Sequence, residues 1–200
     1  TYARGLCDRI DMNAASEPSV KGGLDGGTIY LTTADRWGNM VSFIHSIFSV
    51  YGSGITIPPY GMILHNRGVA FSVDEEHPNV VAPRKRPFHS IIAGMVMQYD
   101  QPLMTFGNMG GSVQPETHAQ HMVNVIDHGM NVQMTTDVAR FTHSQNSNIL
   151  SLEHDLFSLV GRSLQARGHD VRSVNGGRVG GYQGILITRD PNLPQPVFTS

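Results

Sequence analysis

The sequence predicts an α+β protein in which antiparallel β-hairpins are covered by helices. Two hairpin patterns come first along the chain, at residues 28–48 and 90–106. Two helical patterns with amphipathic spacing follow, at residues 115–127 and 153–167. Strands that precede helices, rather than alternating with them, favour an antiparallel sheet with helices layered on it. The same order argues against the repeated βαβ units of a nucleotide-binding fold.

The first hairpin is the most informative segment. It starts at Thr28, directly after Gly26-Gly27, and turns at Asp35-Arg36-Trp37-Gly38-Asn39 before it returns through residues 40–44. Both arms carry apolar runs, as expected for strands that are covered on both faces. If the peptide bond before Thr28 is cut, its hydroxyl becomes a nucleophile with its own α-amine as the adjacent base. That amine has a reference pKa of about 7.7–8.0, so one residue can supply both halves of an acyl-transfer reaction.

The other elements follow from local patterns. Gly129 and Gly168 come directly after the apolar periodicity of two helices and are expected to end them. Arg140 and Glu153 are expected to pair structurally. The remaining elements are expected in this order: a short helix over residues 2–10, a strand over 62–64, a proline-rich loop over 75–88, helices over 115–127, 132–139 and 153–167, and strands over 171–174, 184–188 and 197–199.

Composition narrows the classes of function. The 200 residues hold 14 Lys and Arg against 16 Asp and Glu, and the densest basic cluster, Arg84-Lys85-Arg86, is short, so we expect no nucleic-acid partner. No apolar run approaches the roughly 18–20 residues of a membrane span. The single Cys7 excludes an intrachain disulfide. Because the chain starts at Thr1 rather than Met, we expect a piece of a longer precursor. We expect it in the cytoplasm, with a periplasmic or secreted location as the alternative.

Short motifs are spread over most of residues 28–190. Besides the Thr28 strand and its turn, they are Tyr51-Gly52-Ser53-Gly54, Leu64-His65-Asn66-Arg67, Pro78-Asn79, Pro83-Arg84-Lys85-Arg86-Pro87, Gly107-Asn108-Met109-Gly110-Gly111, Ala139-Arg140-Phe141 and Gly168-His169. Each motif is weak alone, but their order and spacing together are specific. In this combination the chain resembles the small subunit of the γ-glutamyltransferase family, which belongs to the N-terminal nucleophile hydrolases.

The resemblance implies a four-layer αββα sandwich that a large subunit, absent from this chain, completes. It implies a precursor that cuts itself between Gly27 and Thr28 into two subunits that stay together as a heterodimer. Residues 1–27 would then be the tail of the large-subunit region, and residues 28–200 the catalytic small-subunit region. A dimer of such heterodimers is also compatible with the resemblance, and no cofactor is implied.

The resemblance also assigns catalytic residues. Thr28 matches the nucleophile, and Ser46 falls where the family has a second hydroxyl that hydrogen-bonds it. Gly110 and Gly111 match the glycine pair whose backbone N–H groups form the oxyanion hole. A bare backbone just before a helix can aim two donors at one oxygen, and losing one such donor typically costs about 2.7–4 kcal/mol of barrier.

Departures from the family pattern point to the substrate. Where γ-glutamyl enzymes bind the substrate's α-amino group with Asn, Gln and Asp, this chain has Phe48, Arg67 and Ala70. Where they have a serine pair near the substrate carboxylate, it has His89-Ser90. An ammonium beside phenylalanine and arginine would be unpaired or repelled. The pattern is most similar to the oxamate amidohydrolase branch, which implies a small amide that carries a carboxylate and no α-amine, hydrolysed through an acyl-enzyme.

Each assignment has a structural alternative. Thr28 and Ser46 could be ordinary strand residues, and the glycine pair could be a simple turn before a helix. Thr1 is a rival nucleophile, although the residues after it look helical. For the whole protein, the alternatives are a γ-glutamyl transferase or hydrolase of glutathione-type substrates, and a non-cleaving, non-catalytic relative that serves as a binding or structural subunit.

Four basic residues have two interpretations each. Arg67 could form only a structural salt bridge, and His89 could only cap a loop. His118 and His121 lie one helical turn apart, a spacing that two metal ligands can have. Neither has an evident third ligand, so we interpret both as surface or interface histidines and expect no metal site.

Overall fold

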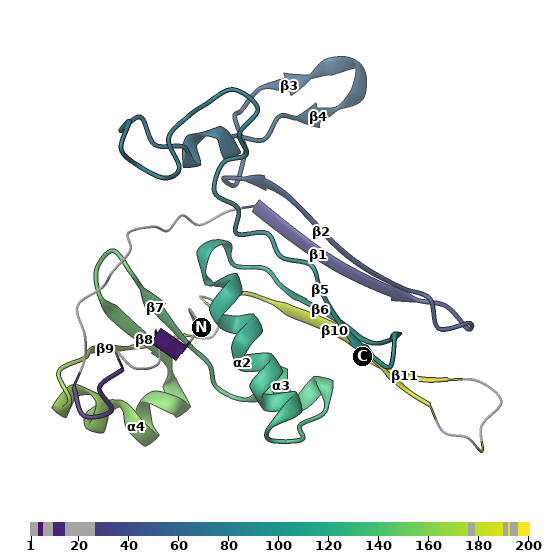
Figure 1. Cartoon of the computed structure of the whole chain (residues 1–200), viewed down its shortest axis with the longest axis vertical. Coiled ribbons are helices and arrows are strands. Elements are labelled where there is room, and N and C mark those ends of the chain that lie inside the picture. The colour runs from purple at the N-terminus through teal and green to yellow at the C-terminus, as the bar shows by residue number, and fades with distance from the viewer. Residues whose placement is uncertain (1–3, 6–9, 15–26, 176–178, 190–191, 193–195) are drawn as a thin grey trace. The chain divides into compact units, whose positions relative to one another are not determined.

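The computed structural model describes residues 4–5, 10–14, 27–175, 179–189, 192 and 196–200 (Figure 1). The chain forms two compact units: a larger unit of Leu24–Val138 and Gly180–Ser200, and a smaller unit of Thr1–Gly23 and Ala139–Val179. The rival nucleophile Thr1, and most of the expected helix over 2–10, lie outside the described residues. Among the described residues, no helix combines the length and the hydropathy that crossing a bilayer requires.

The first predicted hairpin is confirmed. Strands β1 (Gly27–Ala34) and β2 (Met40–Phe48) form a two-stranded antiparallel sheet. The Asp35 carboxylate holds the turn, because it accepts hydrogen bonds from the backbone N–H groups of Trp37 and Asn39 and from the Asn39 side chain. These bonds, the side-chain one first, lower the pKa of Asp35 below its ordinary value.

The second hairpin belongs to a four-stranded antiparallel sheet with the order β11-β10-β6-β5. Its strands are β5 (Gly94–Gln98), β6 (Gln101–Asn108), β10 (Tyr182–Thr188) and β11 (Val197–Thr199). The sequence predicts that this strand begins at Ser90, but β5 begins at Gly94. The backbone N–H of Ile92 donates to the side-chain oxygen of Gln114 at 3.1 Å, so it bonds to a helix residue rather than to a strand neighbour.

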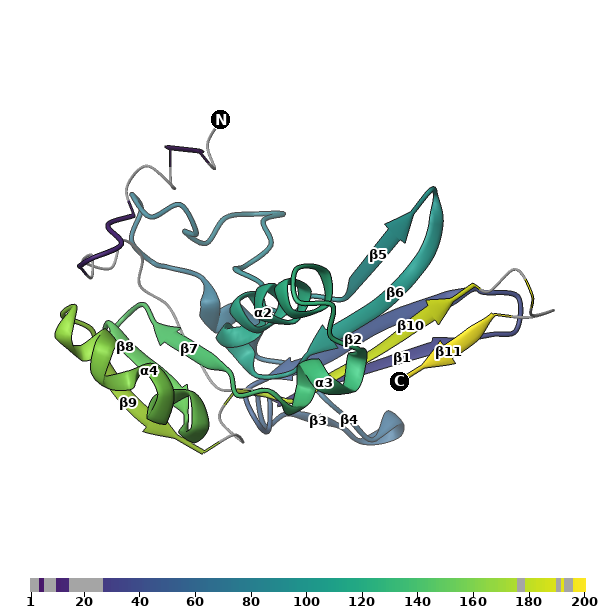
Figure 2. The same ribbon diagram turned by 90° about the horizontal axis from the view of Figure 1, so that it is seen from below.

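Helices cover one face of this sheet. The predicted helices are α2 (Gln114–Ile126) and α3 (Val132–Asp137), and Figure 2 shows them together over the strands. Met104 and Phe106 of β6 point toward them and form a core with Val132 and Tyr182. Met122 and Val125 of α2 are partly buried against this core, but the residues that α2 buries most deeply are polar: Gln114, Thr117, His118 and His121.

The first hairpin covers the opposite face. Alternation along β6 turns Thr105 and Gly107 away from the helices. The Thr32 and Thr105 hydroxyls are hydrogen-bonded, and a Cβ built on Gly107 would lie 2.3 Å from the Tyr30 ring. Only a glycine permits this close approach of the Tyr30 ring. The layers of the larger unit are therefore, in order, the helices, the four-stranded sheet and the two-stranded sheet (Figure 1).

The outer face of the first hairpin is apolar and exposed. Ile29, Leu31, Val41 and Phe43 are 55%, 40%, 51% and 48% exposed. The sequence predicts burial on both faces of these strands, and within the described residues only the inner face is covered. A contiguous apolar patch of this kind marks an interaction surface.

The segment between the two hairpins has little regular structure. Its short elements are β3 (Thr56–Ile57), the 3₁₀ helix η1 (Pro58–Tyr60), β4 (Met62–Ile63) and the 3₁₀ helix η2 (Arg67–Ala70). The predicted strand over 62–64 corresponds to β4, which pairs with β3. The predicted loop over 75–88 is confirmed, apart from a single bridge between Ser72 and Val80.

The smaller unit corrects the expectation of purely antiparallel sheets. Its sheet has the order β7 (Phe141–Ser144), β8 (Ile149–Glu153), β9 (Asp170–Val174), and helix α4 (His154–Ala166) connects β8 to β9. Strands β8 and β9 are parallel, because a connecting helix returns the chain to the same end of the sheet. The predictions of a helix over 153–167 and a strand over 171–174 are confirmed, whereas β7 and β8 escaped sequence analysis.

The expected pairing of Arg140 with Glu153 is confirmed in the smaller unit. Arg140 Nη2 lies 3.3 Å from Glu153 Oε1, and the backbone N–H of Arg140 donates to Glu153 Oε2 at 2.7 Å. Arg140 is 8% exposed. The pair thus fastens the start of β7 to the end of β8.

The uncovered hairpin face predicts how residues 28–200 behave alone. Produced alone, this segment should form associated or unfolded material, because the exposed apolar face of the first hairpin has no cover. Size-exclusion chromatography and thermal melting would measure this. A monomeric segment with a cooperative melting transition would contradict the expectation.

Candidate active site

Thr28 and Ser46 face each other across the first hairpin. Pairing along the ladder steps from Gly27–Phe48 to Thr28–Ser46, which leaves Ile47 as an extra residue on β2. An extra residue of this kind bends a strand and changes the direction of its side chains. Thr28 Oγ1 lies 3.0 Å from Ser46 Oγ, within hydrogen-bond distance. The structure therefore brings the predicted nucleophile and its predicted hydroxyl partner into contact.

Ser46 is the centre of a cluster of donors. The backbone N–H of Phe48 donates to Ser46 Oγ at 3.0 Å, and Arg67 Nη2 donates to the same oxygen at 3.0 Å. With Thr28, three groups converge on one hydroxyl oxygen. Arg67, predicted as a substrate residue, is thus linked to Thr28 through the Ser46 hydroxyl alone.

Arg67 is buried without a carboxylate partner. It begins η2, is 4% exposed, and forms no ion pair with any described residue. Its Cζ lies 4.7 Å from the centre of the Phe48 ring, a cation–π contact that compensates part of the lost hydration. Its Nη1 is buried and has no hydrogen-bond partner in the described structure. Burial lowers the pKa of Arg67, although a guanidinium stays charged at any working pH.

Phe48 has an unusual backbone. Its φ of 74° lies in the left-handed region, which a bulky side chain seldom adopts. The residue is 8% exposed, and its ring lies against the Arg67 guanidinium. Strain of this kind persists where the surroundings enforce it, and it is common at functional sites.

Asn66 holds Arg67 in place, a role that sequence analysis did not assign. Its side-chain oxygen accepts from the backbone N–H of Ser49 at 3.0 Å, and its side-chain nitrogen donates to the Ser49 hydroxyl at 2.9 Å. These bonds tie the start of η2 to the chain just after β2. Asn66 stands in the Leu64-His65-Asn66-Arg67 motif, which was the available signal, but nothing in the sequence identifies Ser49 as its partner.

His89 lies in a cationic neighbourhood. Its side chain is exposed, and its pKa is lowered, first by partial burial and then by the positive charges of Arg67 and Arg86 and by His65. Ser90 beside it is 6% exposed. The charges that act on His89 favour an anion in this region.

Ala70 offers no polar side chain at the third predicted position. It ends η2, and its backbone carbonyl accepts a hydrogen bond from the Asn79 side chain. Together with Phe48, it leaves two of the three positions at which the family resemblance predicts amino-group ligands without an acceptor side chain.

The predicted oxyanion segment lies at the junction of β6 and α2. Gly110 has a φ of 137° and Gly111 a φ of 64°, conformations that favour glycine. A Cβ on Gly110 would lie 2.8 Å from the Val113 side chain. Tyr30 lies on Gly107 in the face-to-face packing of β1 on β6, and side chains alternate along β1. Continuing that register brings Thr28 toward the glycine pair.

His118 and His121 are buried, so their interpretation as surface or interface histidines is wrong. His118 is 7% exposed and His121 0%, because the face of α2 that carries them packs on the sheet. His118 Nε2 accepts a hydrogen bond from the backbone N–H of Asn108 at 2.9 Å, and the His121 ring stacks on Tyr182 with centres 3.7 Å apart. Among the described residues, no three ligand-type side chains gather as a metal site would require.

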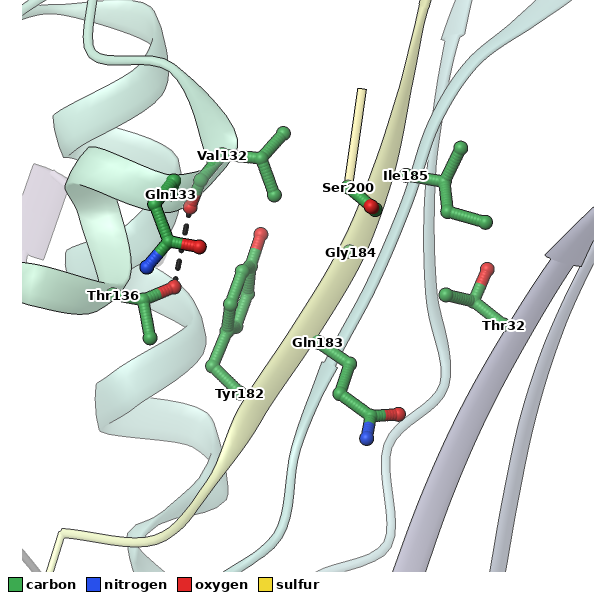
Figure 3. Close-up of a pocket in the computed structure, with 9 residues that line it drawn as sticks. All are labelled: Thr32, Val132, Gln133, Thr136, Tyr182, Gln183, Gly184, Ile185 and Ser200. Atoms are coloured by element: carbon green, nitrogen blue, oxygen red, sulfur yellow. Dashed lines mark hydrogen bonds between the residues drawn. The ribbon is translucent and has the colours of Figure 1, made fainter. Parts of the chain in front are cut away.

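A pocket of about 290 Å³ lies elsewhere in the larger unit (Figure 3). In Figure 3, Val132, Gln133 and Thr136 of α3 face residues 182–185 of β10, and Thr32 and Ser200 complete the lining. It contains none of the predicted site residues. Burial raises the pKa of Tyr182, which stays protonated at working pH. The lining has no nucleophile with an adjacent base, so the Thr28 cluster is the better candidate for chemistry.

The buried position of His118 can be tested by measuring the stability of the protein at acid pH. Burial lowers its pKa, and its Nε2 must stay unprotonated to accept from Asn108. The stabilisation is therefore complete above the ordinary histidine pKa of about 6.5, and it is lost as pH falls through the lowered value. His118→Gln, which does not titrate, should lose less melting temperature than wild type between about pH 8 and about pH 5. Equal losses in both proteins would contradict this.

Comparison with known proteins shows the family of the chain. The family model described as gamma-glutamyltranspeptidase matches residues 1–196. The oxamate amidohydrolase proenzyme of Klebsiella pneumoniae is 34% identical over 192 residues, which cover 94% of this chain and 36% of that protein. The glutathione hydrolase-like YwrD proenzyme of Bacillus subtilis is 37% identical over 140 residues, which cover 70% of this chain and 26% of that protein. The chain therefore spans between about a quarter and about a third of these relatives.

A solved structure supports the same relationship. Cephalosporin acylase from Bacillus halodurans matches with a TM-score of 0.84 at 37% identity, covering 98% of this chain and 35% of that one. The likeness confirms the α+β class and the N-terminal nucleophile hydrolase fold that the sequence predicts. With almost its whole length matched by the family model, the chain belongs to the gamma-glutamyltranspeptidase family.

Proposed function

We propose that this chain carries the nucleophile of a self-processing threonine amidohydrolase that acts on a small amide bearing a carboxylate, such as oxamate. The observation that carries the proposal is the contact network of Thr28, Ser46 and Arg67, in which a buried cation lies one hydrogen bond from the nucleophile's partner. Similarity to the oxamate amidohydrolase proenzyme supports the same substrate class.

The reaction runs in two steps on these residues. Thr28 Oγ1 attacks the amide carbonyl carbon, and its proton passes to the Thr28 α-amine and then to the leaving ammonia. The negative oxygen that forms is bound by the backbone N–H groups of Gly110 and Gly111. Water then hydrolyses the Thr28 ester, which releases the acid and restores the free hydroxyl. The α-amine is the only base that this scheme needs.

The free α-amine requires cleavage of the Gly27–Thr28 bond. In the precursor, Thr28 Oγ1 attacks the Gly27 carbonyl carbon and converts the amide into an ester, which water opens to give a new N-terminus. The relatives from Klebsiella pneumoniae and Bacillus subtilis are both named proenzymes, which supports a processing step. The bulge beside Gly27 and Thr28 supplies irregular geometry at this bond.

The charges favour a carboxylate-bearing substrate over an α-amino one. Arg67 Nη1 is buried and unpaired, so an incoming carboxylate would provide the missing acceptor. His89 would border the same anion. An ammonium group would meet the Arg67 charge, and neither Phe48 nor Ala70 could accept its hydrogen bonds.

The partner that we propose is the large subunit from the same precursor. The larger unit has a helical layer, a four-stranded sheet and a two-stranded sheet, and the outer face of the last is apolar and exposed at Ile29 and Phe43. Completion of an αββα sandwich needs further strands and helices on that side. The length of this chain relative to its relatives leaves room for them.

The variant Thr28→Ala tests the nucleophile. It should leave an uncut precursor with no hydrolysis above background, because both the attacking hydroxyl and the new N-terminus depend on this residue. Intact-mass measurement and N-terminal sequencing would detect cleavage. Thr188→Ala, at the exposed end of β10, is the matched control and should mature normally. Normal processing of Thr28→Ala would sink the assignment.

The substrate class is tested by comparing oxamate with a γ-glutamyl anilide. The matured enzyme should prefer oxamate in kcat/KM by about 100-fold or more, since a site without acceptors for an ammonium rejects it strongly. Arg67→Ala should raise KM for oxamate. Ala70→Asp, which restores a carboxylate, should narrow the gap. A preference of the wild-type enzyme for the anilide would favour the glutathione-type alternative and show the substrate assignment to be wrong.

A further inference from the structure

The hydrogen bonds at Ser46 use the full capacity of its hydroxyl group. Three groups lie 3.0 Å from Ser46 Oγ: Thr28 Oγ1, Arg67 Nη2 and the Phe48 backbone nitrogen. A serine hydroxyl has two acceptor lone pairs and one proton to donate. The guanidinium and the amide N–H can only donate, so these two groups alone fill both lone pairs. The single proton of Ser46 is then left for Thr28 Oγ1, whose lone pairs can accept it.

Ionisation of Thr28 strengthens the hydrogen bond that it accepts from Ser46. When Thr28 Oγ1 gives its proton to its own α-amine, it becomes a charged and therefore stronger acceptor. Arg67 and the Phe48 N–H remain on the two lone pairs of Ser46 Oγ, keep the Ser46 proton directed at Thr28 and make the Ser46 hydroxyl a better donor. An interaction that improves as charge develops lowers the barrier instead of only tightening binding.

We propose that Arg67 is a positioning residue for the nucleophile: through Ser46 it favours the ionised form of Thr28, independently of any contact with substrate. This inference rests on the proposed role of Thr28 as nucleophile. Arg67 then has two separate uses, with Nη2 committed to Ser46 and Nη1 left for an incoming carboxylate. Its burial at 4% exposure and the Phe48 ring against it keep the guanidinium from turning toward solvent.

The two uses of Arg67 separate if the probe carries no carboxylate. p-Nitrophenyl acetate offers an activated ester: Thr28 Oγ1 attacks its carbonyl carbon, the C–O bond breaks, p-nitrophenolate leaves, and the Thr28 proton is held by the α-amine. The first turnover of the matured full-length enzyme therefore reports on the nucleophile alone. Arg67→Ala and Ser46→Ala should each slow this burst by about tenfold or more, as expected for loss of a hydrogen bond to a charged group.

The double variant shows whether Arg67 acts through Ser46. Arg67→Ala added to Ser46→Ala should slow the burst by less than about threefold further, because the route is already broken. In Arg67→Ala the pH of the half-maximal burst rate should rise, and added guanidinium ion should restore part of the rate. Arg36→Ala, which removes an exposed cation from the turn at the far end of the first hairpin, is the control and should keep the wild-type burst.

Each outcome decides between the ideas. An unchanged burst in Arg67→Ala, or an equal loss with and without Ser46, would overturn the positioning role. If Arg67→Ala does not mature, Arg67→Met, which keeps a long side chain but has no charge and no donor, takes its place, and a wild-type burst in that matured variant would also overturn the positioning role. Failure of the wild-type enzyme to hydrolyse oxamate, with the burst pattern intact, would instead overturn the proposed substrate and leave this inference standing.

Discussion

The packing of Tyr30 on Gly107 is the contact on which the arrangement of the candidate site depends. The Tyr30 ring occupies the space where any other residue would have a side chain, so β1 can approach β6 closely only at that glycine. The contact fixes the position of the first hairpin along the strands of the second. Thr28 belongs to the first hairpin and the Gly110 segment to the second. Their relative position therefore follows from this close approach together with the Thr32–Thr105 hydrogen bond.

Two features of the candidate site are unfavourable for the stability of the folded protein. Arg67 is a buried cation without a carboxylate, and Phe48 has a strained backbone. Removing a charge from water costs several kcal/mol unless partners compensate, and here an aromatic ring and a hydroxyl provide only part of the compensation. The two hydrogen bonds between Asn66 and Ser49 offset some of this cost by ordering the backbone that carries Arg67. Such an arrangement is what a site that awaits an anion would have.

Sequence analysis succeeded where the signal is local. The first hairpin, its Asp35 turn and the helix over 115–127 follow from turn chemistry and apolar periodicity, which depend on neighbouring residues. It failed where the determinant is tertiary. The burial of His118 depends on which face of a helix meets the sheet, and the Ser49–Asn66 contact joins residues that no pattern connects. Strand β8 was missed because its five residues run directly into α4, whose periodicity hides the boundary.

The contact between Arg140 and Val179 bears on how the chain folds. Residues 139–179 form most of the smaller unit and separate the two stretches that make up the larger one. Arg140 Nη1 donates to the Val179 carbonyl at 3.4 Å, so this excursion begins and ends at nearly the same point. Once residues 139–179 are folded, β6 and β10 can pair by closing a much shorter flexible loop. The entropy cost of loop closure slows the pairing of strands that are distant in the sequence. Early folding of residues 139–179 should therefore increase the rate at which the four-stranded sheet forms.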